Sequence, residues 1–238
     1  MAVFVAGGVA VETGHYYLPR LFNRLTPPAA LDVVVVPDPL DYLIGDPDWT
    51  YFGFVVSETP ADIGAPPERP CRNWWRWGRD LGAADANRTE FELVIVGRQD
   101  TSVVVQGLEV KVALRDEPGG RQVLACPVGG AEGSPRHIRV NLDWPEGMTS
   151  FVAPGGEGET SDLFLHVAKG HVEKLRVRAE TSSSYVEWTG NLVVIINGAV
   201  QRVPIDCAGK PFRTCAANEL PHWTWQDGDW KRSGLFGA

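Results

Sequence analysis

Two stretches of alternating apolar and polar residues constrain the fold of this chain most strongly. From Glu90 to Ile95, and again from Leu108 to Arg115, apolar residues recur at every second position. Successive side chains of an extended strand point to opposite faces, so this period of two is typical of half-buried antiparallel strands. One face would then carry Phe91, Leu93 and Ile95, followed by Leu108, Val110, Val112 and Leu114. We therefore expect Thr89 to Arg115 to form the first paired strands of a single sandwich.

The same pattern continues along the chain, in residues 136–142, 163–167 and 174–179 and, with more apolar residues, in 185–196. Asn197-Gly198 then predicts a two-residue hairpin turn, because both residues tolerate the positive φ angles of such turns. Many short strands with close turns and no helical pattern between them favour an immunoglobulin-like antiparallel β-sandwich. The predicted fold class is all-β, with the sandwich over residues 87–215, one short helix and an irregular N-terminal extension.

That extension, residues 1–70, is rich in proline, which removes a backbone donor and prevents long strands or helices. Two short strands are expected within it, at Val33–Val36 and Tyr51–Val56. Because few of its residues can lie in regular secondary structure, the extension cannot build a core of its own. We therefore expect it to add irregular strands to one edge of the sandwich.

Residues 71–86 contain the one convincing helix, NWWRWGRDLG. Asn73 is a suitable N-cap and Gly82 a suitable stop, while Trp74, Trp77 and Leu81 lie on one stripe. Helical spacing already explains the tryptophans, so they are expected to be buried against one end of the sandwich.

The apolar start of the chain, residues 1–11, leaves two interpretations open. It is shorter than the roughly 20 residues that span a bilayer and it lacks the basic region of a signal peptide. It is therefore either an ordinary first strand or the remnant of a membrane anchor whose beginning lies upstream.

The four cysteines, Cys71, Cys126, Cys207 and Cys215, include no CxxC pair and so give no zinc-ribbon signal. Two disulfides can be drawn: Cys207 with Cys215 would close a short loop, and Cys71 with Cys126 would tie the helix to the sheet. Four buried thiols are the alternative, and only an oxidising compartment favours the bridges.

A second concentration of tryptophan lies in the C-terminal segment, residues 216–238. If Asp227-Gly228 makes a two-residue turn, Trp225 pairs with Trp230, and Trp223 and Arg232 fall on the same face. Such a face could stack on sugar rings or receive a partner's side chains. The simpler interpretation, which we favour, is a small ribbon that folds back over the sandwich to cover an open edge.

Signals for catalysis and cofactors are missing from the sequence. The five histidines have no HExxH spacing, the serines form no GxSxG motif, and the glycine-rich loops fit no phosphate-binding pattern. We therefore predict no cofactor, no metal site and no catalytic residues, and favour a protein that is not an enzyme. A net charge of −8 argues against binding to nucleic acid.

Several segments together resemble a group of uncharacterised proteins from actinobacteria. They are CRNWWRWGRDLGAADA at 71–86, LACPVGG at 124–130, RHIRVNLD at 136–143 and DCAGKPFRT at 206–214. No activity is established for that group, so the resemblance carries over no functional residues. In that group an all-β region often follows a membrane helix or a regulatory N-terminal segment. The resemblance implies that the apolar start of this chain is the remnant of a membrane anchor, with the β-region outside the cytoplasm, where disulfides could form.

Two functional hypotheses follow. The first is a non-catalytic interaction module that binds another protein, at the cell surface if the anchor exists and in the cytoplasm otherwise. The second is a carbohydrate-binding module, or with less support a glycan-active enzyme, that uses Trp223, Trp225 and Trp230 as a stacking platform beside Arg232.

Overall fold

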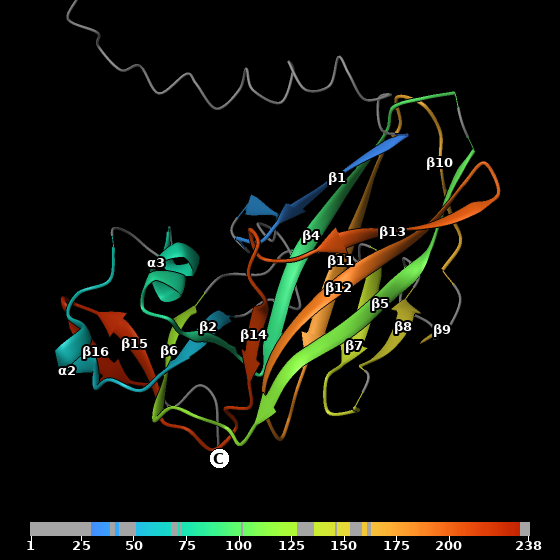
Figure 1. Ribbon diagram of the computed structural model, residues 1–238. Helices are drawn as coiled ribbons and strands as arrows, with labels where there is room; N and C mark the ends of the chain where they lie inside the picture. Colours follow the sequence, from blue (N-terminus) through green and yellow to red (C-terminus); the bar gives the residue numbers. More distant parts are fainter. Residues whose placement is uncertain are drawn as a thin grey trace, which may run out of the picture.

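The computed structural model describes residues 30–38, 41–42, 51–67, 71, 73–100, 102–127, 136–145, 147–152, 159–160 and 163–233. These residues form an all-β protein in which two sheets pack as a sandwich, as the alternation pattern predicts. Figure 1 shows the two layers at one end of the molecule and a smaller lobe, which carries α2, α3, β15 and β16, at the other. The apolar residues 1–11 lie outside the described part. Among the described residues no helix has the length and apolar character needed to cross a membrane.

Sheet A has six strands. In spatial order they are β1 (Leu31–Val36), β4 (Arg88–Gly97), β11 (Val172–Glu180), β7 (His137–Asn141), β8 (Met148–Val152) and β9 (Glu159–Thr160). Neighbouring strands are antiparallel except for β11 and β7, which are parallel.

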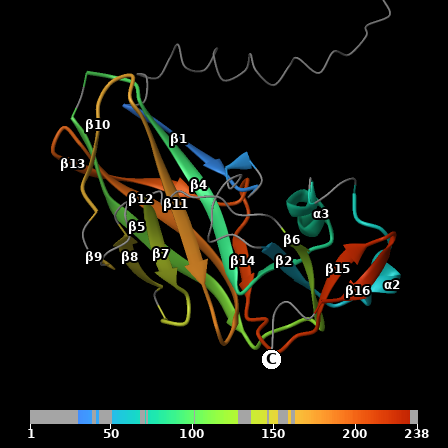
Figure 2. The ribbon, with the colours of Figure 1, turned by 180° about the vertical axis from the view of Figure 1, so that it is seen from behind.

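Sheet B has ten strands and continues from the sandwich into the smaller lobe. Its order is β10 (Leu165–Val167), β5 (Val103–Asp116), β12 (Tyr185–Ile196), β14 (Phe212–Cys215), β3 (Ala84–Ala86), β2 (Tyr51–Val56), β6 (Gln122–Pro127), β15 (His222–Gln226) and β16 (Asp229–Arg232). The tenth strand, β13 (Ala199–Ile205), also pairs with β12. Figure 2 shows the lobe from the opposite side.

The main core lies between the sheets, and the predicted strand phases point into it. Phe91, Leu93 and Ile95 of β4 are fully buried there, and Phe91 stacks on Phe212 with a centroid separation of 4.6 Å. Across the core, burial fades along β5: Leu108 is buried, Val110 and Val112 are partly buried, and Leu114 is 45% exposed. The prediction that these side chains of β5 face the core is therefore confirmed for all of them except Leu114.

The two opening strands do not pair with each other, which corrects the expectation from sequence. Strand β4 pairs with β1 and β11 in sheet A, whereas β5 pairs with β10 and β12 in sheet B. The connection between them crosses from one layer to the other, so that their apolar faces meet across the core. An alternation pattern fixes the buried face of a strand but not its neighbour.

The short strands of the N-terminal extension divide between the sheets. Strand β1 lies at the edge of sheet A, as expected, but β2 lies inside sheet B, between β3 and β6. The expectation that both would join one edge is therefore wrong for β2. Two of its aromatic residues, Phe52 and Phe54, are buried in a cluster with Trp74 of helix α3 (Trp74–Asp80), and Ile63 of the short helix α2 (Pro60–Ile63) packs against that cluster.

Candidate interaction site at the loop end of the sandwich

The most exposed tryptophan in the described β-sandwich is Trp144, in the loop that joins β7 to β8. Its side chain is 56% exposed, whereas Leu142, two residues earlier, is fully buried at the end of the core. The backbone carbonyl of Trp144 accepts hydrogen bonds from the backbone N–H of Gly147, at 3.1 Å, and from the guanidinium of Arg115, at 2.9 Å. The loop therefore presents a large aromatic side chain from a backbone that is held at both sides.

The residue before it, Asp143, fixes the loop to a second one. Its carboxylate accepts hydrogen bonds from the hydroxyls of Thr181, Ser182 and Ser183, at 2.7–2.8 Å, and from the backbone N–H of Ser182, at 3.0 Å. Partial burial raises the pKa of Asp143, but these hydrogen bonds outweigh it and lower the pKa to about 2. The carboxylate is therefore ionised at neutral pH and ties the loop after β7 to the loop after β11.

Gly147 completes the turn for a steric reason. Its φ is +64°, in the left-handed region that glycine adopts readily, and a Cβ there would lie 2.8 Å from a methyl carbon of Val110. A side chain at this position would push the loop away from β5. The glycine thus allows the Trp144 loop to close against the strand.

The predicted aromatic face of the C-terminal ribbon exists, but it faces the lobe's interior. Trp225 pairs with Trp230, and Trp223 with Arg232, as the Asp227-Gly228 turn predicts. Trp230 is 8% exposed, packs parallel to Trp77 of α3 with a centroid separation of 6.4 Å, and donates its indole N–H to the carbonyl of Gly64. The helical tryptophans and the ribbon tryptophans thus form one small core.

Consequently the four ribbon residues are not equally available to a ligand. Trp230 is buried, and Trp223 and Trp225 are half-buried against the same cluster. Arg232, at the end of β16, is exposed. A ligand at this ribbon would meet the outer parts of Trp223 and Trp225, and its existence stays a prediction.

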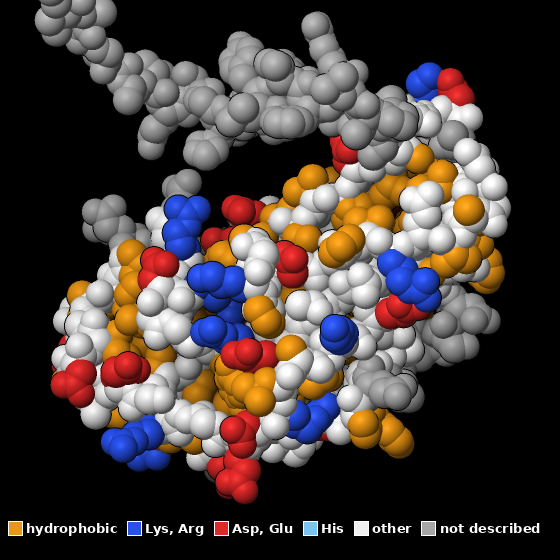
Figure 3. All heavy atoms as spheres, viewed as in Figure 1, with side chains coloured by type: hydrophobic (Ala, Val, Ile, Leu, Met, Phe, Trp, Pro, Cys, Tyr) orange, Lys and Arg blue, Asp and Glu red, His pale blue; other side chains and the backbone are white. Residues whose placement is uncertain are grey.

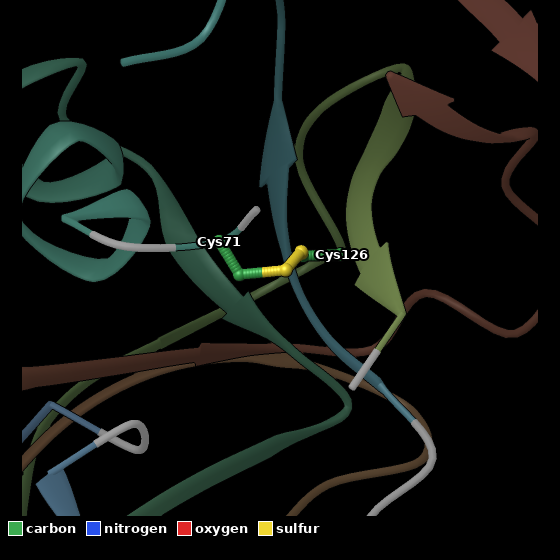
Figure 4. Close-up of a disulfide and its surroundings, with 2 residues drawn as sticks. All are labelled: Cys71 and Cys126. Atoms are coloured by element: carbon green, nitrogen blue, oxygen red, sulfur yellow. A yellow bond between two sulfur atoms is a disulfide. The ribbon is translucent and has the colours of Figure 1, made fainter. Parts of the chain in front are cut away.

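Of the two disulfides considered from the sequence, the structure contains one. Cys71 and Cys126 form a disulfide that joins the segment before α3 to β6, as drawn from the sequence (Figure 4). Cys207 and Cys215 are free thiols, so the proposed short-loop disulfide is wrong. Cys207 forms a backbone bridge with Lys210, whereas Cys215 is buried in a separate apolar cluster. Burial raises the pKa of both thiols, which keeps them protonated.

Sequence reasoning missed a buried ionic cluster on the outer face of sheet A. Glu90 is fully buried and lies within 3.3–3.6 Å of the guanidinium nitrogens of Arg88, Arg176 and Arg178. Burial, and then the charge of Glu90, raise the pKa of Tyr42, whose ring lies 5.5 Å from the Arg176 guanidinium. The cluster thus surrounds one buried carboxylate with three guanidinium groups and places the Tyr42 ring against the outer face of sheet A.

No group of three or more metal-ligating side chains occurs among the residues that the structure describes. Comparison of the chain with protein-family models, with curated proteins and with solved structures found no match.

Proposed function

We propose that this protein is a non-catalytic interaction module that binds another protein through the loop end of its sandwich. The observation that carries the proposal is Trp144, an exposed tryptophan whose backbone carbonyl accepts hydrogen bonds from Gly147 and Arg115. Tryptophan is the residue type that most often dominates the energy of an interface. Because Asp143 and Arg115 hold the loop, little conformational entropy is lost when a partner covers the ring.

The surroundings of Trp144 have the chemistry of a protein-binding surface. The hydroxyls of Ser182 and Ser183 lie on the adjoining loop, and Leu114, at the end of β5, exposes 45% of its surface. An aromatic anchor with small hydroxyl residues beside it is typical of loop surfaces that recognise proteins. The Cys71–Cys126 disulfide supports a location in an oxidising compartment, which agrees with a role at the cell surface.

The test compares three forms of the chain in affinity purification from the organism that produces it. The baits are the parent, Trp144→Ala and Phe164→Ala. Phe164→Ala is the control, because Phe164 is also an exposed aromatic residue, at 74%, but lies away from the loop, just before β10. A partner retained by the parent and by Phe164→Ala but lost with Trp144→Ala supports the proposal. With that partner purified, we expect Trp144→Ala to weaken binding by about 2 kcal/mol, roughly 30-fold.

A partner that binds Trp144→Ala as tightly as the parent contradicts this proposal. The carbohydrate-binding alternative makes a different prediction, because it depends on the exposed parts of Trp223 and Trp225. Glycan binding that is lost in Trp225→Ala but kept in Trp144→Ala would favour that alternative.

A further inference from the structure

A second surface, distant in sequence from the Trp144 loop, is the edge of sheet A formed by β1. This strand pairs with β4 along all six of its residues, and no described strand lies on its other side. Figures 1 and 2 both show β1 as the outermost labelled strand of its sheet. Val34, in its middle, is 52% exposed, and Figure 3 shows hydrophobic side chains at the surface over this upper part of the molecule.

The hydrogen-bonding groups at this edge follow from the pairing of β1 with β4. The backbone N–H of Arg98 donates to the carbonyl of Ala30, so the even-numbered residues of β1 direct their backbone groups toward β4. In an antiparallel strand, alternate residues bond to opposite sides. Leu31, Val33 and Val35 therefore direct three N–H and three C=O groups toward the edge.

The usual protections of an edge strand are missing from β1. Its sequence, LDVVVV, contains no lysine, no proline and no glycine, and its register with β4 has no bulge. The single charge, Asp32, already pairs with Arg98 at 2.5 Å. An unprotected, β-branched edge of this kind favours pairing with another strand.

We propose that β1 pairs with β1 of a second copy of this chain, antiparallel and across a two-fold axis, to form a dimer with one continuous sheet. The reason for choosing a second copy is that β1 is complementary to itself. In the register centred on Val33, each Val33 faces the other and Leu31 faces Val35, so all twelve edge groups of the two strands are bonded. Val33 and Val35 pack against the main core, so the cores of both copies would adjoin on the same side of the joined sheet.

The charges also permit this register. Residues that face each other have numbers that sum to 66, so Asp32 of one copy lies opposite Val34 of the other. The two aspartates therefore never face each other directly, although each chain carries a net charge of −8. Both residues lie on the outer face of the sheet, where water reaches them.

This arrangement makes a register-specific prediction for Val34, which can be changed without disturbing the core because it is half-exposed. In Val34→Asp, the new carboxylate of each copy lies opposite Asp32 of the other copy, so two carboxylate pairs face each other across the interface. In Val34→Lys, an ammonium group lies opposite Asp32 at each of these two positions. At low ionic strength we expect Val34→Asp to raise the dimer dissociation constant roughly tenfold or more and Val34→Lys to keep the dimer. Lysine at an edge ordinarily blocks pairing, so its tolerance here distinguishes this register from a non-specific contact.

Analytical ultracentrifugation of the purified chain at rising concentration, up to about 1 mM, measures both effects. Thermal melts check that both variants fold, and hydrogen exchange should show slower exchange at Leu31, Val33 and Val35 in the dimer. A parent that stays monomeric throughout overturns the proposal, as does association that continues beyond the dimer. Equal responses of Val34→Asp and Val34→Lys, whether both dissociate or both remain dimeric, also overturn it.

Discussion

At the scale of single residues, Asp143 shows how one carboxylate can order a surface. It lies at the surface, yet its two oxygens accept hydrogen bonds from three consecutive residues of another loop. The ladder between β7 and β11 ends at the pair Asn141 and Glu180, so the hydrogen bonds of Asp143 extend the link between these two strands into the loops that follow them. Trp144 directly follows Asp143 in the first of these loops.

The stability that Asp143 contributes depends on pH in a defined direction. Its folded-state pKa of about 2 is below the unfolded value, so the contribution is present above about pH 4 and is lost as the pH falls toward 2. Asp143→Asn should lower the free energy of unfolding by about 1 kcal/mol at neutral pH, a figure reduced for solvent screening at this exposed site. Urea titrations at pH 7 and near pH 2 would measure it.

The matched control is Asp100→Asn, which removes an exposed ion pair with Lys169 and should change stability by about 0.5 kcal/mol or less. If Asp143→Asn lowered the free energy of unfolding by as much near pH 2 as at pH 7, the stabilising role given to the ionised Asp143 carboxylate would be wrong.

At the scale of elements, the smaller lobe is organised by helix α3 and the disulfide beside it. Trp74 and Trp77 of the helix meet Trp230 of β16, so a segment near residue 75 and one near residue 230 share one cluster. The Cys71–Cys126 disulfide joins the start of the helix to β6 beneath it. The helix is seven residues long, which is too short to be stable alone, so its packing and the disulfide hold it in place.

Removing the disulfide should therefore destabilise the lobe substantially. The bond closes a loop with a sequence separation of 55, for which chain entropy predicts about 4 kcal/mol, with measured losses of roughly 2–5 kcal/mol. We expect the double variant Cys71→Ser/Cys126→Ser to melt at a lower temperature than the parent. A reductant should lower the parent's melting temperature to a similar degree and leave the variant unchanged.

Cys207→Ser serves as the control, because it removes a free thiol. Alkylation of the unfolded, unreduced parent should label two cysteines; labelling of all four would show that the disulfide does not form in solution.

At the scale of the whole molecule, the sequence predicts the strands better than it predicts their arrangement. Burial of Leu93 and Ile95 follows from alternation alone, because the side-chain period of a strand is geometric. The separation of β4 and β5 into different sheets depends on pairings with residues far along the chain, and no local pattern records these.

The burial of the Glu90 cluster and of the ribbon tryptophans could not be predicted from local sequence either. The polar positions of β4 and β11 suggest a solvated face, yet Glu90 is buried among three arginines and lies close to Tyr42. The ribbon tryptophans have the spacing of an exposed platform, yet α3 covers them. In both cases the burial depends on residues that lie elsewhere in the sequence, whereas the Asn197-Gly198 and Asp227-Gly228 turns, which are local, were predicted correctly.

The strand phase gives a prediction for the folding of the whole chain. Leu93→Asp places a carboxylate in the main core without a partner, at a cost of several kcal/mol against a total stability of about 5–15 kcal/mol. We expect this variant to be insoluble or unfolded by circular dichroism. Val172→Asp, on a neighbouring strand but 56% exposed, should fold as the parent does. A folded Leu93→Asp protein with the parent's melting temperature would contradict the assigned phase.

The strand order of sheet B also bears on how the chain is made. Strands β3, β2 and β6 lie side by side between β14 and β15, so late segments flank the early segments of this sheet on both sides. During synthesis, β3 and β6 emerge long before β14 and β15, the strands that pair with their outer sides. The sheet can close only after Trp230 has left the ribosome, so the apolar residues of β2 and β6 must avoid aggregation until almost the entire chain is present.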